Sequence, residues 1–491
     1  MDDLSRFGPQ LALLIAAGII VVVDTMLPFF GRSAYLKRRT LMSGLALLGV
    51  AGSIAWSLGL IAADERGPAF DGMIAVDDFT LFFNFLFAGV AGIVILGSFD
   101  FLERNRYQGE YLALVLASTA GLSLMAAGTD LITIFIALEL QAIALFALVG
   151  ISKTQASSEA ALKFLLLSAI STAITLYGMA YLFGLSGETS LEGIARFVAT
   201  ADEGSRSGLV LAAVFLTAGL GFKMAVVPFQ MWVPDVYQGA PTPITAYLSV
   251  ASKAAGFAVV MRIFLVALGE GIVTDDWAIL FAAIAAVSMT VGNVMALVQT
   301  DIKRMLGYSS IAQAGTFLIG LAAVAAQDPQ LLLGTSSVVF FLGTYAFTNL
   351  GAFMAVIAIS NKIGSDRIED YAGVAKRSPA LALGLAACLI SLTGIPPTAG
   401  FIAKVYVFNS AVQADLVWLA IIGVLNSVIS AYYYLRVVLN MFTREPDTEE
   451  SFLPSPSLGL TLAASVVGLF VIGVYPSPLI EASESAARIF G

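Results

Sequence analysis

Long apolar runs separated by short polar connections dominate this chain of 491 residues. A run of about 20 apolar residues is long enough to cross the roughly 30 Å of hydrocarbon in a bilayer. The pattern therefore predicts an all-α integral membrane protein with about fourteen transmembrane helices. Their approximate extents are 9–30, 40–62, 78–99, 110–128, 130–151, 159–185, 208–232, 242–268, 277–299, 304–326, 334–360, 379–413 with a break, 415–442 and 457–475.

The seventh and the twelfth of these runs each combine a lysine with a helix-breaking proline. The seventh carries Lys223 and Pro228, and the twelfth carries Pro396, Pro397 and Lys404. Proline inside a span frees backbone carbonyls that only a protein-lined, hydrated cavity can satisfy. Broken helices at corresponding positions of two halves are typical of transport sites. We therefore expect two inverted five-helix repeats, formed by segments four to eight and nine to thirteen.

The charge of the connections predicts the orientation of the chain. Lysine and arginine are concentrated in the odd-numbered connections, for example at Arg38, Arg104 and Lys376. The positive-inside rule makes that side cytoplasmic, so both termini are predicted to face outward. The expected location is the cell inner (plasma) membrane, where outward means the periplasmic side. The first residues lack the basic segment and the cleavage site of a signal peptide, so the first run is expected to remain as a span.

Composition excludes several kinds of redox chemistry. Only 12% of the residues are charged, 59% are hydrophobic, and the chain has no histidine and one cysteine, Cys388. Haem held by histidine, four-cysteine iron–sulfur clusters and ordinary zinc sites all need ligands that the chain does not have. Electron transfer is therefore not expected within it, and no metal or cofactor site is predicted.

Charged residues inside the apolar runs are the candidates for function, because a charge at the centre of a bilayer costs several kcal/mol. Four of them lie about midway along their spans: Glu139, Lys223, Lys253 and Lys404. Burial disfavours the ammonium form of lysine and a nearby carboxylate restores it, whereas arginine never releases its proton. A Glu/Lys pair that opens and closes can therefore carry a proton.

Other charged and aromatic residues have simpler explanations. Lys163 lies one turn after Glu159, so it is either a fifth functional lysine with a coupling role or a surface ion pair. Asp24 is near a span end and is expected to be structural. Arg262 is also near a span end, where its guanidinium could extend to the membrane surface. The tyrosines at 432–434 indicate an interfacial aromatic belt more than a quinone contact.

Several motifs resemble the antiporter-like subunits of complex I, the NADH:quinone oxidoreductase of respiration. They are the segments 223–243, 252–257, 301–315 and 391–404. The string Asp-Val-Tyr-Gln-Gly-Ala-Pro-Thr-Pro (235–243), the segment 369–379 and lysine at position 404 make the chain similar to subunit N. Gln230 is a departure, since many relatives have histidine there.

This resemblance implies a proton-translocating subunit without a redox centre of its own. It implies that Glu139 and Lys223 form the coupling pair, that Lys253 passes protons on, and that Lys404 exchanges them with one aqueous side, with Lys163 passing the charge signal. NADH, FMN, iron–sulfur clusters and quinone are expected in partner subunits. The expected partners are subunit M, small subunits such as K, and membrane lipids.

The resemblance also implies a division of the chain. Residues 1–109 form three N-terminal transmembrane helices, 110–268 the first antiporter-like half, 269–443 the second antiporter-like half, and 444–491 a C-terminal transmembrane helix. Three alternatives remain open: a photosynthetic NDH-type complex, a multi-subunit Na⁺/H⁺ antiporter, and a scaffold that translocates nothing.

Overall fold

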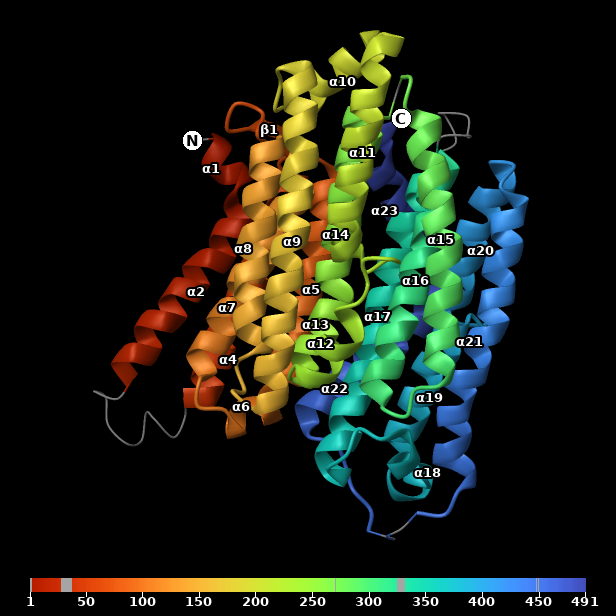
Figure 1. Ribbon diagram of the computed structural model, residues 1–491. Helices are drawn as coiled ribbons and strands as arrows, with labels where there is room; N and C mark the ends of the chain where they lie inside the picture. The colour runs from red at the N-terminus through yellow and green to blue at the C-terminus, as the bar shows by residue number, and fades with distance from the viewer. Residues whose placement is uncertain (1, 28–37, 270, 325–331, 447, 449) are drawn as a thin grey trace. The chain divides into compact units, whose positions relative to one another are not determined.

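A computed structural model describes residues 2–27, 38–269, 271–324, 332–446, 448 and 450–491. Within them the chain is almost entirely helical (Figure 1) and forms two compact units. The first unit contains 1–220, 239–247 and 251–273, and the second contains 221–238, 248–250 and 274–491. The predicted ends of the first and tenth spans, beyond 27 and 324, lie outside the described residues.

The first unit holds the N-terminal helices and a small β-hairpin. Strand β1 (Gly67–Ala69) pairs antiparallel with β2 (Ile74–Val76), with Pro68 opposite Ala75. Helix α7 lies at the centre of this unit, in contact with α2, α4, α5, α8 and α14. The helices are α1 (Asp2–Arg6), α2 (Gly8–Met26), α4 (Arg38–Ala62), α5 (Asp78–Gly97), α6 (Phe99–Arg104), α7 (Gln108–Ala127), α8 (Leu131–Val149), α9 (Gln155–Ser186), α10 (Leu191–Thr200), α11 (Glu203–Met224, continuing into the second unit), α13 (Thr242–Tyr247), α14 (Lys253–Met261) and the π-helix η3 (Arg262–Ala267).

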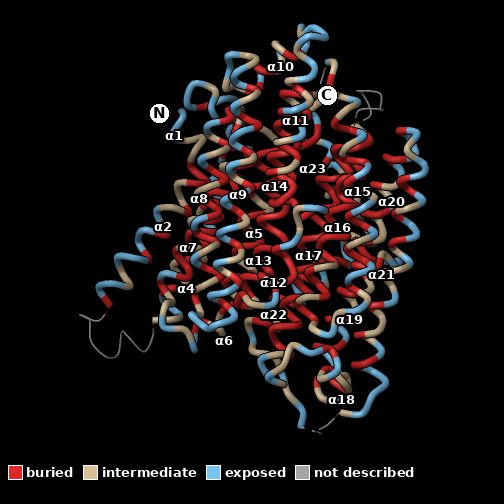
Figure 2. Tube along the Cα trace, viewed as in Figure 1, coloured by how far each residue is buried: buried red, intermediate tan, exposed pale blue. Residues whose placement is uncertain are grey.

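The second unit is built around α16 and α17. Helix α17 contacts α16, α19, α20, α22 and α23, and Figure 2 shows α16 and α17 mainly in the colour of buried residues. The elements are α12 (Val233–Gly239), α15 (Thr274–Leu297), α16 (Ile302–Val324), α17 (Leu333–Ile363), η4 (Ile368–Tyr371), α18 (Val374–Arg377), α19 (Pro379–Thr393), α20 (Ala399–Gln413), α21 (Val417–Thr443), α22 (Pro456–Val474), α23 (Ser477–Ala487) and η5 (Arg488–Phe490). A π-helix, η2 (Leu248–Ser252), joins α13 to α14.

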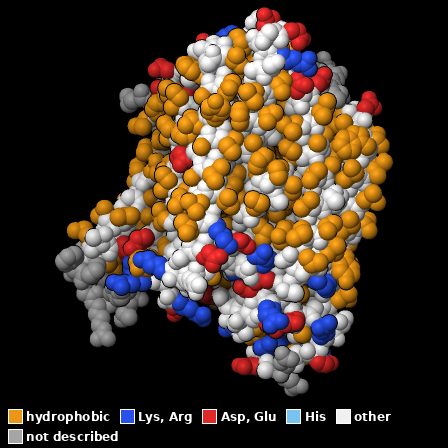
Figure 3. Space-filling view, viewed as in Figure 1, with side chains coloured by type: hydrophobic (Ala, Val, Ile, Leu, Met, Phe, Trp, Pro, Cys, Tyr) orange, Lys and Arg blue, Asp and Glu red, His pale blue; other side chains and the backbone are white. Residues whose placement is uncertain are grey.

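The predicted all-α membrane fold is confirmed. Among the described residues, thirteen helical spans are long and apolar enough to cross a membrane. The twelfth predicted run appears as α19 and α20, each of 15 residues, because the chain is interrupted between Thr393 and Ala399. Hydrophobic side chains cover the visible sides of the helices and charged ones gather near their ends (Figure 3). The inverted repeats and the four-part division stay predictions.

Helix ends follow from local sequence. Asp77 precedes α5 and its Oδ1 accepts a hydrogen bond from the backbone N–H of Thr80 at 2.8 Å. Asp130 precedes α8 and accepts one from the N–H of Ile132 at 2.8 Å. Such side chains satisfy N–H groups that the first helical turn leaves free. The ends of α11 and α19 are different, because proline-containing segments follow them within the membrane-spanning region.

Candidate functional site

Lys404 is buried between the two halves of the broken helix. It lies in α20 and is 7% exposed. Its Nζ donates hydrogen bonds to the carbonyl oxygen of Thr393, 2.8 Å away at the end of α19, and to Ser427 Oγ in α21 at 3.1 Å. Among the described residues, no carboxylate lies within ion-pair distance of Lys404. Neutral oxygens therefore hold the amine in a region where an uncompensated charge is costly.

Two glycines allow the half-helices to meet around this lysine. Gly394 ends α19 with φ +90°, and its N–H donates to the carbonyl of Ile390 at 3.1 Å. The N–H of Gly400 donates to Ser391 Oγ at 3.2 Å. A Cβ atom on Gly400 would lie 1.9 Å from the carbonyl oxygen of Ser391. No other residue type permits this approach without movement of the backbone.

A small polar cavity adjoins Lys404. Its volume is about 10 Å³, close to the space that one water molecule needs. Thr348 Oγ1 and Ser391 Oγ, 3.2 Å apart, both line it. The remaining lining residues are Gln313, Phe341, Thr344, Tyr345, Leu392 and Gly400. A lysine beside a cavity of this size can exchange a proton with a water molecule that enters it.

Hydroxyl groups extend the polar region away from the cavity. Tyr345 lines the cavity and donates to Ser310 Oγ at 3.2 Å, and Tyr237 Oη lies 3.3 Å from the same Ser310 Oγ. All three are fully buried or nearly so. Our interpretation of the sequence missed these residues, because it considered only ionisable groups at mid-span. Hydroxyl and amide side chains within apolar runs were the signal that could have found them.

Lys223 is in the last turn of α11 and is 6% exposed. The helix ends one residue later, as the proline at 228 predicts. The indole N–H of Trp232 donates to the carbonyl of Phe222 at 3.0 Å, and the N–H of Val227 donates to Ser288 Oγ at 2.9 Å. These bonds satisfy backbone groups at the break. A cation in the last turn is favoured by the partial negative charge of the helix C-terminus.

Glu139 is half-buried in α8. Its Oε1 accepts a hydrogen bond from Thr172 Oγ1 of α9 at 2.8 Å. It belongs to the first unit and Lys223 to the second. Their pairing, which the resemblance implied, stays a prediction.

Lys253 is 2% exposed, and it begins α14 directly after the π-helix η2. π-Helical turns are rare and often occur at functional sites. The sequence pattern predicted an ordinary α-helix here. Lys253 therefore follows directly on a local irregularity of the helix.

Lys163 differs from the other lysines. Its side chain is 44% exposed, and its Nζ lies 2.8 Å from Glu159 Oε1, one turn earlier. The structure thus contains the ion pair that we had considered as the alternative to a functional role. A coupling role of Lys163 stays a prediction.

Arg262 corrects one interpretation. Instead of reaching the surface it is 3% exposed, and its Nη2 lies 2.8 Å from Asp77 Oδ2 and 2.9 Å from Thr80 Oγ1. Its Nε donates to the carbonyl of Ala126 at 2.9 Å. The charge is therefore paired and structural. A partner 185 residues away in the sequence could not be inferred from hydropathy.

The tyrosines at 432–434 also correct an interpretation. Tyr432 is 65% exposed, but Tyr433 and Tyr434 are buried. Tyr433 donates to Asn293 Oδ1 at 2.9 Å, and Tyr434 is hydrogen-bonded to Ser309. The aromatic-belt interpretation is wrong for these two residues, which hold α21 against α15 and α16.

No group of three or more metal-ligating side chains occurs among the described residues. Cys388 is buried in α19 with a free thiol.

Broken helices that carry buried lysines, one of them beside a small cavity, define a membrane protein of the ion-translocating type. The chain belongs to the family described as NADH:quinone oxidoreductase/Mrp antiporter, whose model matches residues 128–430. The match includes all five lysine and glutamate candidates.

Within this family the chain is similar to proteins named NADH-quinone oxidoreductase subunit N, which confirms the resemblance to that subunit. The relative from Dehalococcoides mccartyi is 43% identical, with 98% of this chain and 99% of the relative covered. The relative from Desulforamulus reducens is 41% identical, with 98% and 97% covered. A chain of respiratory complex I from Thermus thermophilus superimposes with a TM-score of 0.78 at 30% identity, with 96% of this chain and 98% of that chain covered.

Proposed function

We propose that this chain is a proton-translocating membrane subunit of a complex I type NADH:quinone oxidoreductase. Its near full-length similarity to curated N subunits and to a chain of complex I supports this function. In that assembly the chain contributes ion movement, and electron transfer from NADH to quinone takes place elsewhere. The chain is thus part of an enzyme, a translocase.

The proposed proton path uses the four buried ionisable residues. Opening and closing of the Glu139 and Lys223 pair changes the charge felt by Lys253, which passes a proton on to Lys404. Each step moves a proton between groups that can both gain and lose one, which lysine can do and arginine cannot. Lys163 transmits the charge change to the neighbouring subunit. To do so, its ammonium group has to leave the ion pair with Glu159.

The setting of Lys404 is the observation that carries this proposal. The described partners of this buried amine are a carbonyl and a hydroxyl, beside space for one water, and no ion pair occurs among them. A purely structural lysine would be expected to face a carboxylate. Loss and uptake of a proton is the chemistry that such a site supports best.

The rest of the enzyme belongs to partner subunits. NADH, FMN, iron–sulfur clusters and quinone bind there, and this chain contacts other membrane subunits, among them subunit M and small subunits such as K. The basic connections face the cytoplasm and both termini face the periplasm of the cell inner membrane.

The proposal is tested by donor-driven proton uptake in inverted membrane vesicles from a strain with Lys223→Ala. Quinone reductase activity is recorded in parallel, and assembly is checked on native gels. We expect proton uptake and quinone reduction to fall at least tenfold together while the complex stays assembled. Lys362→Ala, at the exposed end of α17, is the matched control and should behave as wild type.

Two outcomes contradict the proposal in different ways. Normal proton uptake by assembled Lys223→Ala complex would remove the relay. Unchanged quinone reduction with loss of sodium tolerance would instead support the Na⁺/H⁺ antiporter alternative, which the family description also includes.

A further inference from the structure

A strongly basic pocket lies at one end of the first unit. It is lined by the start of α4 and by the connection from α6 to α7, and its volume is about 460 Å³. Its lining residues are Arg38, Arg39, Glu103, Arg104, Asn105, Arg106 and Gln108. Both segments are odd-numbered connections between spans, so they lie on the same side of the membrane.

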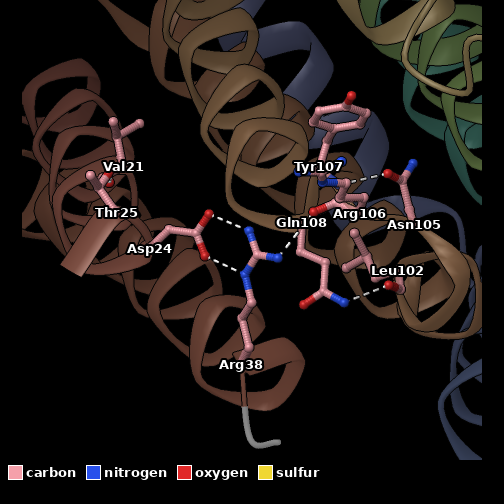
Figure 4. A network of polar contacts seen from close by, with 9 residues as sticks. All are labelled: Val21, Asp24, Thr25, Arg38, Leu102, Asn105, Arg106, Tyr107 and Gln108. Atoms are coloured by element: carbon pink, nitrogen blue, oxygen red, sulfur yellow. Dashed lines mark hydrogen bonds and ion pairs between the residues drawn. The ribbon is translucent and has the colours of Figure 1, made fainter. Parts of the chain in front are cut away.

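Two of the arginines form the fixed wall of the pocket. Arg38 makes two bonds of 2.5 Å to the carboxylate of Asp24, and its Nη1 donates to the carbonyl of Arg106 at 3.0 Å (Figure 4). Arg39 lies 2.7 Å from Glu103 Oε2 and stacks over the ring of Phe99. These charges are neutralised, and their contacts join α2, α4 and the α6–α7 connection.

The other two arginines keep their charge available. Arg104 and Arg106 are exposed, and neither has a carboxylate within ion-pair distance among the described residues. Asp24 and Glu103 are already used by Arg38 and Arg39. The pocket therefore retains two positive charges in close proximity, which repel each other unless an anion binds between them.

The amide groups of the pocket add a second kind of recognition. Gln108 Nε2 donates to the carbonyl of Leu102 at 2.8 Å, and Asn105 Oδ1 accepts from the N–H of Tyr107 at 2.8 Å. Gln108 Oε1 is buried and has no hydrogen-bond partner among the described residues. Figure 4 shows this oxygen pointing away from Leu102. A buried acceptor of this kind is stabilised by a hydroxyl donor on a ligand.

The surface next to the pocket is apolar. On α2 and α4, Met26, Leu41 and Leu48 are 51%, 45% and 69% exposed. A ligand that fits both surfaces has an anionic head with hydroxyl groups and a hydrocarbon tail. Guanidinium groups bind phosphate with charge-assisted, often bidentate hydrogen bonds.

We propose that this pocket binds the headgroup of an anionic phospholipid. The phosphate lies between Arg104 and Arg106, a headgroup hydroxyl donates to Gln108, and the acyl chains follow the exposed faces of α2 and α4. Free phosphate shares the headgroup's charge but would leave the apolar faces uncovered.

The test is photo-crosslinking of the whole complex in nanodiscs. Trace phosphatidylglycerol with a diazirine in its headgroup is added to phosphatidylcholine discs, and crosslinked peptides of the α6–α7 connection are quantified by mass spectrometry. One positive charge near a membrane surface contributes a factor of about five in lipid binding. The double variant Arg104→Gln/Arg106→Gln should therefore lower crosslinking there by about 25-fold, and each single variant by about fivefold.

Controls separate the sources of binding. The matched double variant Arg196→Gln/Arg206→Gln changes exposed arginines on other connections and should leave this crosslink unchanged. Within the described part of the chain neither Arg104 nor Arg106 is in an ion pair, so assembly on native gels should be normal.

Three results would overturn the proposal: equal crosslinking in the Arg104/Arg106 double variant, equal crosslinking by a phosphatidylcholine probe, or displacement of the lipid by millimolar inorganic phosphate. The first two would show contact with the apolar faces alone. The third would show a site for free phosphate.

Discussion

Lys404 Nζ lies 2.8 Å from the carbonyl oxygen of Thr393, so the lysine of one half-helix binds the last residue of the other. The proline-containing interruption frees carbonyl groups at the end of α19, and the lysine occupies one of them. The helix interruption supplies a hydrogen-bond acceptor for Lys404, and Lys404 satisfies a carbonyl group that the interruption leaves free. This hydrogen bond explains why the prolines and the lysine occur together in the sequence.

Gly394→Ala should disturb this arrangement. A Cβ atom there would lie 2.8 Å from Lys404 Cδ, and the φ of +90° costs a non-glycine residue about 1–2 kcal/mol. We expect a several-fold fall in proton pumping by assembled complex. Gly364→Ala is the control, since that glycine also has a positive φ at a helix end but has nothing within 4 Å. Similar pumping by the two variants would mean that the position of Lys404 does not matter.

Arg262→Ala should be strongly destabilising. It removes a buried guanidinium and leaves the partly buried Asp77, 20% exposed, without its partner; the cost is expected at or below the about 3–5 kcal/mol of a fully buried ion pair. Thermal unfolding of the purified complex and its yield on native gels measure the effect. Arg196→Ala removes an exposed pair with Glu192 and should cost below about 1 kcal/mol. Equal stability of the two variants would contradict the structural role of Arg262.

Comparison of Lys163→Gln with Glu159→Gln separates the two roles of Lys163. Both changes break the same exposed ion pair, so their effects on stability should be small and equal. If the lysine couples to the neighbouring subunit, quinone reductase and pumping fall several-fold in Lys163→Gln alone. Equal activities in both variants would leave the lysine as a surface partner only.

The apolar pattern predicted most of the spans and both interruptions, because burial in lipid imposes length and proline acts locally. It also located Lys404 and Lys223. It did not predict that Tyr345 and Ser310 extend the polar region, since many hydroxyl groups occur in the apolar helices and only tertiary contacts show which of them meet. The pairing of Arg262 with Asp77 depends on tertiary contacts, and the π-turn before Lys253 depends on packing around it, so neither was readable from local sequence.

Asp301 gives a test that depends on pH. It precedes α16, its Oδ1 accepts from the N–H of Arg304 at 3.0 Å, and burial of the carboxyl raises its pKa. A raised pKa means that the carboxyl of Asp301 binds a proton more tightly in the folded protein than in the unfolded chain, so protonation stabilises the fold. This stabilisation is complete below the unfolded value of about 3.9 and is lost as pH rises through the folded value.

Asp301→Asn keeps a capping oxygen but cannot titrate. The melting temperature of wild type relative to this variant should therefore rise as the pH is lowered from 7 toward 4. Asp71→Asn, in an exposed loop, is the control. A constant difference across that range would contradict the titration of Asp301.

The π-helix η2 contains one residue more than a regular helical turn needs. A π-turn holds one residue more than an α-turn, so deletion of one residue within 248–252 would let the segment close as a regular α-helix. Because one α-turn then replaces one π-turn, Lys253 would keep about the same direction and depth. The same deletion within α13, which is already α-helical, would rotate everything after it by about 100° about the helix axis. Of these two neighbouring segments, η2 is therefore the one that can lose a residue without turning Lys253 toward other neighbours.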